Sequence, residues 1–321
     1  MSVEKTRVPL LREEGTTITQ HGVSIEKRAA GGGVGVLTSL AAGAAAGAVA
    51  KTTIAPLDRC KINFQVSSTP YSWAAALRFL RDAVRAEGWA ALWRGNSATM
   101  ARIVPYAAVQ FAAHEQWKRL LGVDTGASGR AAPLRLLLAG SLAGVTSQSA
   151  TYPLDVARAR MAVAARPLGS LRAVLAGILR EEGAASLYRG YSATVLGVVP
   201  YAGVSFFTYD TLKQAHRERT GREPGGTVKL AMGGAAGALA QTASYPLDIV
   251  RRRMQTAARR ADRTYPYPTV RAALALVWRS EGWRGFFKGL SMNWVKGPIA
   301  VGVSFTTYDF IKSALAGLSP P

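Results

Sequence analysis

Three stretches of the sequence align without gaps, and each joins an apolar run to a charged one. They are TIAPLDRCKINFQ (53–65), ATYPLDVARARMA (150–162) and ASYPLDIVRRRMQ (243–255). Their prolines, Pro56, Pro153 and Pro246, follow one another at intervals of 97 and 93 residues. Self-similarity at a fixed period indicates copies of one structural unit. The sequence therefore predicts three repeats.

Two further elements recur in phase with the first. One reads EGWAALWRG (87–95), EGAASLYRG (182–190) and EGWRGFFKG (281–289). The other reads HEQWK (114–118), YDTLK (209–213) and YDFIK (308–312). One Pro-x-Asp-x-x-Lys/Arg motif carries little information, but three motifs that each occur three times in the same order are highly specific.

Long apolar runs alternate with these elements. The runs without any Asp, Glu, Lys or Arg are 29–50, 136–154, 190–209 and 230–247. Two more runs, 95–113 and 289–308, are interrupted only by Arg102 and Lys296. Since a bilayer core of about 30 Å requires roughly 20 helical residues, all six can span it. Small-residue pairs recur in phase and favour close helix packing in a membrane over core helices of a soluble protein; they are Gly43/Gly47, Gly140/Gly144 and Gly233/Gly237.

The charge balance supports a membrane protein with one strongly basic face. The net charge is +21, yet only 18% of the residues are charged and 49% are hydrophobic. Six spans place both termini on one side, and the loops 59–94, 156–189 and 249–288 together hold 22 Lys and Arg against 6 acids. This bias predicts that these loops face the matrix or the cytoplasm. A single cysteine, Cys60, and three scattered histidines predict neither a disulfide nor a metal or cofactor site.

An amphipathic stretch follows the first element of each repeat. In 72–88, Leu77 and Leu80 share a face opposite Arg78 and Arg81, and the counterparts are 170–183 and 269–282. We interpret these stretches as helices that lie at the membrane interface, the alternative being a solvated face of a soluble helix. The predicted fold class is an all-α membrane protein with six transmembrane helices in three pseudo-threefold repeats, each with one short amphipathic helix. The predicted division is an N-terminal tail (1–34), repeats at 35–122, 131–217 and 226–315, and a C-terminal tail (316–321).

These tripled motifs resemble the mitochondrial carrier family over residues ~35–315, and the runs 94–115 and 288–309 are most similar to members that carry coenzyme A. The resemblance implies an antiporter of the mitochondrial inner membrane, with both termini toward the intermembrane space and the amphipathic helices on the matrix side. Its implied substrates are coenzyme A, or a close analogue such as dephospho-coenzyme A, and adenine nucleotides in exchange. It also implies a functional monomer that binds cardiolipin at the helices that start after Arg94, Arg189 and Lys288.

The charges after each proline can pair in two ways. Acid and base lie three residues apart on one helix face and can form local ion pairs. Alternatively, the threefold repeat lets the acid of one repeat pair with the base of the next, in a ring of Asp58 with Arg158, Asp155 with Arg251, and Asp248 with Lys61. The resemblance implies that this ring is a gate on the matrix side, braced by Gln65 and Gln255. The second repeat has Ala162 at the brace position.

A second ring is predicted at the opposite, cytoplasmic mouth. Its candidate pairs are Glu115/Lys118, Asp210/Lys213 and Asp309/Lys312, with the aromatic residues Tyr209 and Tyr308 before the last two acids. His114 takes the aromatic position in the first repeat, either as a packing substitution or as a pH sensor.

The substrate site is predicted where the threefold symmetry breaks. Seven residues after Gly95, Gly190 and Gly289 stand Arg102, Gly197 and Lys296. An unpaired cation at mid-membrane costs roughly 2.5–3.5 kcal/mol, so such cations mark functional sites. Lys51, whose repeat equivalents are Gln148 and Gln241, is a third candidate. We expect Lys51, Arg102 and Lys296 to hold phosphates while an aromatic ring packs on Gly197, Val198 and Tyr201.

Several other functions remain to be compared with this one. Another carrier for adenine nucleotides or phosphate would present the same cations to its substrate. The charge of +21 also fits a soluble helical repeat that binds nucleic acid, and a third class is an ion or proton leak pathway. The sequence contains neither GxSxG nor a Walker lysine loop, so an enzyme is the least expected class.

Overall fold

The structure is a computed structural model that describes residues 33–123, 131–164, 168–259, 262 and 264–318. Within these residues the fold is entirely helical. One order of elements occurs three times: a long helix, a short helix, a turn of 3-10 helix and a second long helix. The elements are α1 (Gly33–Val66), α2 (Trp73–Glu87), η1 (Trp89–Trp93), α3 (Asn96–Leu120), α4 (Ala131–Val163), α5 (Leu171–Glu182), η2 (Ala184–Tyr188), α6 (Tyr191–Thr220), α7 (Gly226–Thr256), α8 (Val270–Glu281), η3 (Trp283–Phe287) and α9 (Leu290–Leu318). The predicted N-terminal tail lies almost wholly outside the described residues.

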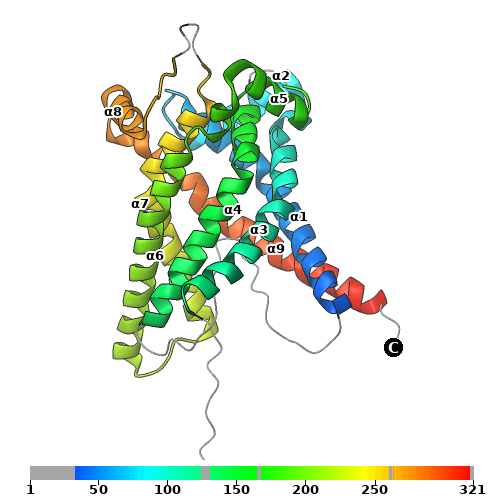
Figure 1. The fold of residues 1–321 in the computed structure, drawn as a ribbon, viewed down its shortest axis with the longest axis vertical. Coiled ribbons are helices and arrows are strands. Elements are labelled where there is room, and N and C mark those ends of the chain that lie inside the picture. The colour runs from blue at the N-terminus through cyan, green and yellow to red at the C-terminus, as the bar shows by residue number, and fades with distance from the viewer. Residues whose placement is uncertain (1–32, 124–130, 165–167, 260–261, 263, 319–321) are drawn as a thin grey trace, which may run out of the picture.

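The six long helices form a closed ring. The second long helix of each repeat packs along the first long helix of the next, as α3 on α4, α6 on α7 and α9 on α1. The first long helices α1, α4 and α7 also contact one another. Figure 1 shows that the long helices converge at the end where α2, α5 and α8 lie and spread apart at the other end. The start of α1 and the end of α9 both lie at the spread end.

The long helices have 25 to 34 residues, which corresponds to about 38–51 Å at 1.5 Å per residue and exceeds the bilayer core. By length and mean hydropathy, one segment of the described residues, Ala184–Thr220, qualifies as a membrane span, with a mean hydropathy of 1.2. Each long helix runs through a proline without interruption, in the second long helices as well (Pro105, Pro200 and Pro298).

The short helices occupy the predicted amphipathic stretches and have local start and stop signals. The side chains of Ser72, Ser170 and Thr269 accept a hydrogen bond from a backbone N–H of the first turn, as N-caps do. The glycine of each Glu-Gly pair ends the helix with a positive φ, for example 81° at Gly88. These signals explain why the Glu-Gly pair recurs in every repeat.

Glycine is required where a second long helix begins. Gly95 and Gly190 have φ values of 86° and 79°, and an added Cβ would lie 2.9 Å from the carbonyl oxygens of Arg158 and Arg251 respectively. The start of α3 is therefore pressed against the backbone of α4, and the start of α6 against that of α7. This close approach holds neighbouring repeats together at the convergent end.

The expectation that the glycine pairs mediate close packing is wrong for the members whose surroundings are described. A Cβ on Gly47, Gly140, Gly144 or Gly237 would meet no atom within 4 Å. The buried small residues on the same helices are alanines: Ala42, Ala46, Ala50, Ala139, Ala143, Ala236 and Ala240. Alanine is small enough for close helix approach, and the glycines face open space instead.

Candidate functional site

Three ion pairs join the repeats at the convergent end. Arg158 Nη2 lies 2.5 Å from Asp58 Oδ2. Arg251 Nη2 lies 2.6 Å from Asp155 Oδ2, and Lys61 Nζ lies 3.0 Å from Asp248 Oδ2. In each case the acid of one repeat contacts the base of another, so the pairing within one helix does not occur. All three carboxylates have side chains that are at most 17% exposed.

Two of these ion pairs receive a hydrogen bond from a glutamine. Gln65 Nε2 donates to Asp248 Oδ2 at 3.0 Å, and Gln255 Nε2 donates to Asp155 Oδ2 at 2.7 Å. The same amides lie 3.3 and 3.0 Å from the hydroxyl oxygens of two buried tyrosines, Tyr245 and Tyr152. The sequence prediction missed these tyrosines, although each directly precedes the motif proline, where the first repeat has Ala55.

The pair of Asp58 and Arg158 has no glutamine, since the equivalent position is Ala162. A different residue contacts Asp58: Lys296 Nζ lies 2.6 Å from its Oδ1 atom. Asp58 therefore binds two cations, one from α4 and one from α9. A small cavity remains here between the first and second repeats, lined by Lys51, Asp58, Arg158 and Ala162 among others.

An outer layer of ion pairs surrounds the ring and uses the glutamates of the Glu-Gly pairs. Arg160 binds both carboxylate oxygens of Glu182, at 2.5 and 2.8 Å. Arg253 and Lys288 contact Glu281 at 2.6 and 2.5 Å. Burial opposes ionisation of Glu182, but the hydrogen bonds from Arg160 outweigh it and hold the pKa of this carboxyl below its ordinary value. In the second and third repeats the glutamate thus ties the short helix to the long helix before it.

The first repeat departs from this pattern. Glu87 contacts Arg94, which follows it in the same repeat, and Arg59 at 3.8 Å. The Arg94 guanidinium also donates to the carbonyl oxygen of Ala164 at 2.6 Å, and Lys288 Nζ donates to the carbonyl oxygen of Ser67 at 3.0 Å. The basic residue before each helix-starting glycine therefore reaches into the loop of a neighbouring repeat.

Arg102 and Lys296 were expected to be unpaired, and this expectation is wrong. Arg102 Nη1 lies 3.7 Å from Asp155 Oδ1, and its Nη2 donates to Gln148 Oε1 at 2.6 Å. Lys296 contacts Asp58. Both cations point toward the centre of the ring rather than toward lipid. Their counter-ions are carboxylates of the ring itself, which the sequence had already assigned to other partners.

Lys51 is the third predicted substrate cation. It lines the cavity beside Asp58 and Arg158, and its electrostatic neighbours are Asp58, Lys296, Arg158 and Arg102. Its side chain makes no hydrogen bond to any residue within the described part of the chain. Lys51 thus lies close enough to the two other cations to interact with them electrostatically.

The predicted apolar surface lies on α6. Gly197, Val198 and Tyr201 are half-buried there. A Cβ on Gly197 would lie 3.7 Å from Leu247 Cβ, which is an ordinary contact, so the backbone does not require glycine at this position. Among the described residues, none forms a hydrogen bond with the Tyr201 hydroxyl. None of the hydrogen bonds between described residues joins these three residues to Lys51, Arg102 or Lys296.

Arg252 is a ring cation that the sequence prediction missed. Its Nη1 atom lies 3.4 Å from Asp155 Oδ2 and 2.9 Å from Gln255 Oε1. The equivalent positions in the other repeats, six residues after each motif proline, are Ile62 and Ala159. A comparison of the repeats at this position would have identified Arg252 as a further break in the symmetry.

The predicted cytoplasmic pairs lie at the spread end, where no ion pair among the described side chains joins one repeat to another. Glu115 pairs with Lys118 on its own helix at 2.9 Å, and Lys213 lies 3.7 Å from Glu223 in the following turn. Asp210 and Asp309 are exposed, and the described residues include no counter-ion for either. The side chain of Lys312 lies outside the described residues. Three half-buried aromatic side chains accompany these acids, namely His114, Tyr209 and Tyr308.

Comparison with known proteins agrees with the threefold architecture. The family described as "Mitochondrial carrier protein" matches residues 33–125, 129–219 and 223–319. The chain is 55% identical to the mitochondrial coenzyme A transporter SLC25A42 of Homo sapiens over 287 residues, which cover 88% of this chain and 89% of the relative. It is 38% identical to mitochondrial carrier protein CoAc1 of Zea mays, over 88% and 87% of the two chains. It is 40% identical to solute carrier family 25 member 16 of Mus musculus, over 86% and 87%. The chain therefore belongs to the mitochondrial carrier family and is a transporter rather than an enzyme.

Proposed function

We propose that this protein is an antiporter of the mitochondrial inner membrane that imports coenzyme A, or a close analogue such as dephospho-coenzyme A, in exchange for adenine nucleotides. Relatives at 55% identity are named coenzyme A transporters. Coenzyme A carries a diphosphate and a ribose phosphate monoester, so its site must supply several positive charges. An adenine nucleotide offers the same aromatic base and fewer phosphate-bearing positions.

The observation that carries this proposal is the excess of cations around the ring. The three carboxylates of Asp58, Asp155 and Asp248 lie among seven basic side chains, so four positive charges are not neutralised by the ring itself. The seven are Lys51, Lys61, Arg102, Arg158, Arg251, Arg252 and Lys296. Such an excess among buried side chains is costly without a counter-ion, and a phosphate-bearing substrate supplies one.

The arrangement of the helices supports a specific topology. We assign the six long helices as the membrane spans, with α2, α5 and α8 on the matrix side and both termini on the intermembrane side. The start of α1 and the end of α9 at the spread end are consistent with this assignment. The first turns of α3, α6 and α9 offer helix N-termini where the phosphates of cardiolipin can bind. A ring that is complete within one chain lets a monomer function.

Ring carboxylates and substrate phosphates compete for Arg102 and Lys296, and this competition suggests how substrate binding opens the matrix gate. In the unloaded state these cations add to the charge that holds Asp155 and Asp58. Substrate phosphates that bind Arg102 and Lys296 withdraw them from the two carboxylates and weaken the closed state. A ligand can shift a conformational equilibrium only through its different affinity for the two states, and this exchange of partners provides the difference. The cytoplasmic pairs of Glu115, Asp210 and Asp309 would then form as the matrix end opens.

Exchange in proteoliposomes tests the proposal. The purified protein is reconstituted, and uptake of labelled coenzyme A is measured with ADP inside the vesicles and with no internal nucleotide. We expect saturable uptake that depends on internal ADP and is unaffected by external pantothenate, which lacks phosphate. Equal uptake without internal ADP would exclude antiport, and exchange of ADP without any uptake of coenzyme A would favour an adenine nucleotide carrier.

A further inference from the structure

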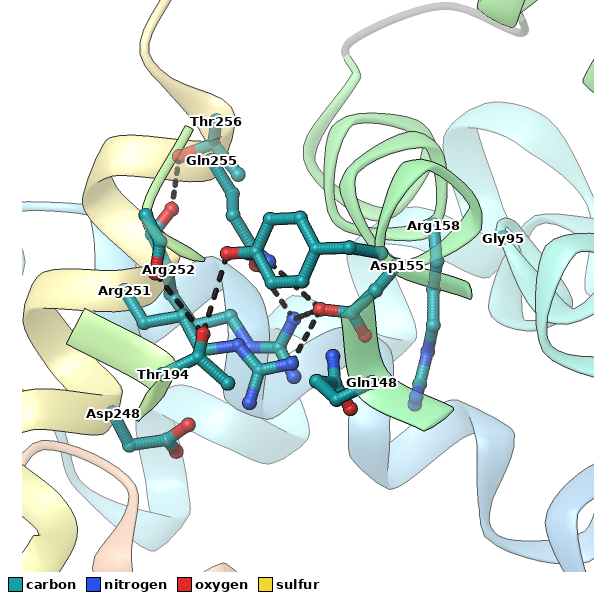
Figure 2. Close-up of polar contacts among 12 residues, drawn as sticks. Gly95, Gln148, Asp155, Arg158, Thr194, Asp248, Arg251, Arg252, Gln255 and Thr256 are labelled. Carbon is teal, nitrogen blue, oxygen red and sulfur yellow. Dashed lines mark hydrogen bonds and ion pairs between the residues drawn. The ribbon is translucent and has the colours of Figure 1, made fainter. Parts of the chain in front are cut away.

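Three basic side chains surround one carboxylate of the ring. Asp155, whose side chain is 1% exposed, is approached by Arg251 at 2.6 Å, by Arg252 at 3.4 Å and by Arg102 at 3.7 Å. Figure 2 shows the side chains of Arg251 and Arg252 side by side, both directed toward Asp155, with Gln148 below the same carboxylate in this view. Three guanidinium groups and one carboxylate leave two positive charges without a counter-ion at this place.

Arg252 is not needed to close the ring. Arg251 already makes the ion pair that the repeat requires, and Ile62 and Ala159 occupy the positions equivalent to Arg252 in repeats whose ion pairs also form. The threefold architecture therefore does not explain this arginine. A residue that breaks the symmetry of the ring without closing it is suited to recognising an asymmetric substrate.

Several donors beside Asp155 have no acceptor. Gln148 Nε2, Arg251 Nε and Arg252 Nε are buried and make no hydrogen bond. An unsatisfied buried donor is destabilising, and nearly all buried polar groups in proteins have a partner. The other amide atom of Gln148, Oε1, is held by Arg102 at 2.6 Å, so its free N–H groups are fixed in orientation. These three donors beside Asp155 therefore have hydrogen-bonding capacity that an anion could use.

A second cluster with the same charge excess lies on the other side of the ring. Asp58 has Arg158 and Lys296 within 2.6 Å, and Lys51 lies in the same cavity. Two clusters with two excess charges each fit a substrate with two separate anionic groups. Lysine ammonium groups are compact charges on flexible chains, whereas arginine presents fixed pairs of donors that suit the oxygens of a phosphate monoester.

We infer that Arg252 and Gln148, together with Arg102, form a subsite for the ribose phosphate monoester of the substrate, while Lys51 and Lys296 bind its diphosphate. This inference rests on the proposed function, because it names the part of coenzyme A that each cluster binds. It makes Arg252 a specificity-determining residue. Dephospho-coenzyme A lacks the ribose phosphate and leaves this subsite empty.

The test compares coenzyme A with dephospho-coenzyme A as external substrates for reconstituted wild-type protein and for Arg252→Gln. We expect Arg252→Gln to raise the KM for coenzyme A about tenfold, as the loss of one charge-assisted hydrogen bond does, and the KM for dephospho-coenzyme A less than about twofold. Gln148→Leu should also raise the ratio of the KM for coenzyme A to the KM for dephospho-coenzyme A, by a smaller factor than Arg252→Gln. Arg252→Lys should restore part of the wild-type ratio. Lys51→Gln is the matched control, since it should raise both KM values by similar factors.

A purely structural role for Arg252, as a support for Gln255, would impair both substrates equally. An unchanged ratio of the two KM values in Arg252→Gln therefore overturns the inference, even where the maximal rate falls. The thermal unfolding midpoint of each variant separates loss of folding from loss of recognition. If the wild-type protein takes up neither compound, the proposed function fails instead, so the two failures are distinguishable.

Discussion

The ammonium nitrogen of Lys296 lies 2.6 Å from Oδ1 of Asp58. Lys296 is one of the cations assigned to the substrate, and Asp58 is one of the acids that close the matrix end. A single contact therefore links the proposed binding site to the proposed gate. The contact between Arg102 and Asp155 repeats this relationship in the neighbouring repeat.

Ala162→Gln should strengthen the closed matrix end. By threefold symmetry the new amide would brace the pair of Asp58 and Arg158, as Gln65 and Gln255 brace the other two pairs, and Ala162 lines the cavity beside this pair. A hydrogen bond to a charged group contributes about 1.5–3 kcal/mol. We expect a higher thermal unfolding midpoint and slower coenzyme A exchange. Faster exchange with a lower midpoint would contradict the role of the braces.

Gln255→Ala should have the opposite effect. The change removes the hydrogen bond to Asp155 and leaves the hydroxyl of Tyr152 without its amide partner. We expect the unfolding midpoint in detergent to fall by several degrees, since about 1–3 kcal/mol is lost. A double-mutant cycle with Asp155→Asn measures the coupling energy between Gln255 and Asp155. We expect a stabilising coupling; a value close to zero would show that the amide does not act through this carboxylate.

Gly190→Ala should destabilise the junction of α6 with α7. The new Cβ would lie 2.9 Å from the carbonyl oxygen of Arg251, and the residue has a φ of 79°. Backbone strain of this kind costs about 1–3 kcal/mol. Gly203→Ala on the same helix is the matched control, because its Cβ would meet no atom within 4 Å. The thermal midpoint should fall for the first variant and remain within about one degree for the second; similar midpoints would show that the close approach is not needed.

Glu182→Gln should reveal a pH-dependent contribution to stability. Arg160 lowers the pKa of Glu182 in the folded protein, whereas in the unfolded chain it is near the ordinary value of about 4.3. The ion pair therefore stabilises the fold when the pH is above the ordinary pKa. This contribution to stability is lost as the pH falls through the lowered pKa of the folded protein. We expect the midpoints of wild type and Glu182→Gln to differ at pH 7 and to converge in acid. The exposed neighbour allows a control, Glu181→Gln, which should match wild type throughout; a difference for Glu182→Gln that is independent of pH would exclude this explanation.

The sequence was sufficient to predict the features that repeat and insufficient for those that do not. The helical fold follows from the spacing of the repeats, which also allowed the contact of Asp58 with Arg158 as one of two possible pairings; the structure contains that contact. The partners of Arg102 and Lys296 could not be predicted, since each contacts a carboxylate that already has a partner from another repeat. That sharing depends on side-chain reach across the ring, which the sequence does not specify.

Other features that the prediction missed could have been found by comparing the three repeats in the sequence. Arg252 differs in charge from Ile62 and Ala159 at equivalent positions, and Tyr152 and Tyr245 precede two of the three motif prolines. The packing role of the glycines was misjudged for a physical reason. A small residue allows close approach but does not require it, and in this protein the alanines of the same helices are the ones in contact.

The central claim is that phosphate groups bind the cations that also hold the ring carboxylates. Uptake of labelled coenzyme A against internal ADP, measured for Lys51→Gln, Arg102→Gln and Lys296→Gln, tests it most directly. Arg78→Gln serves as the control, because Arg78 is exposed on α2. We predict that each of the three variants loses at least about tenfold in uptake at subsaturating coenzyme A, while the control exchanges at the wild-type rate. Normal uptake by all three variants would contradict the claim.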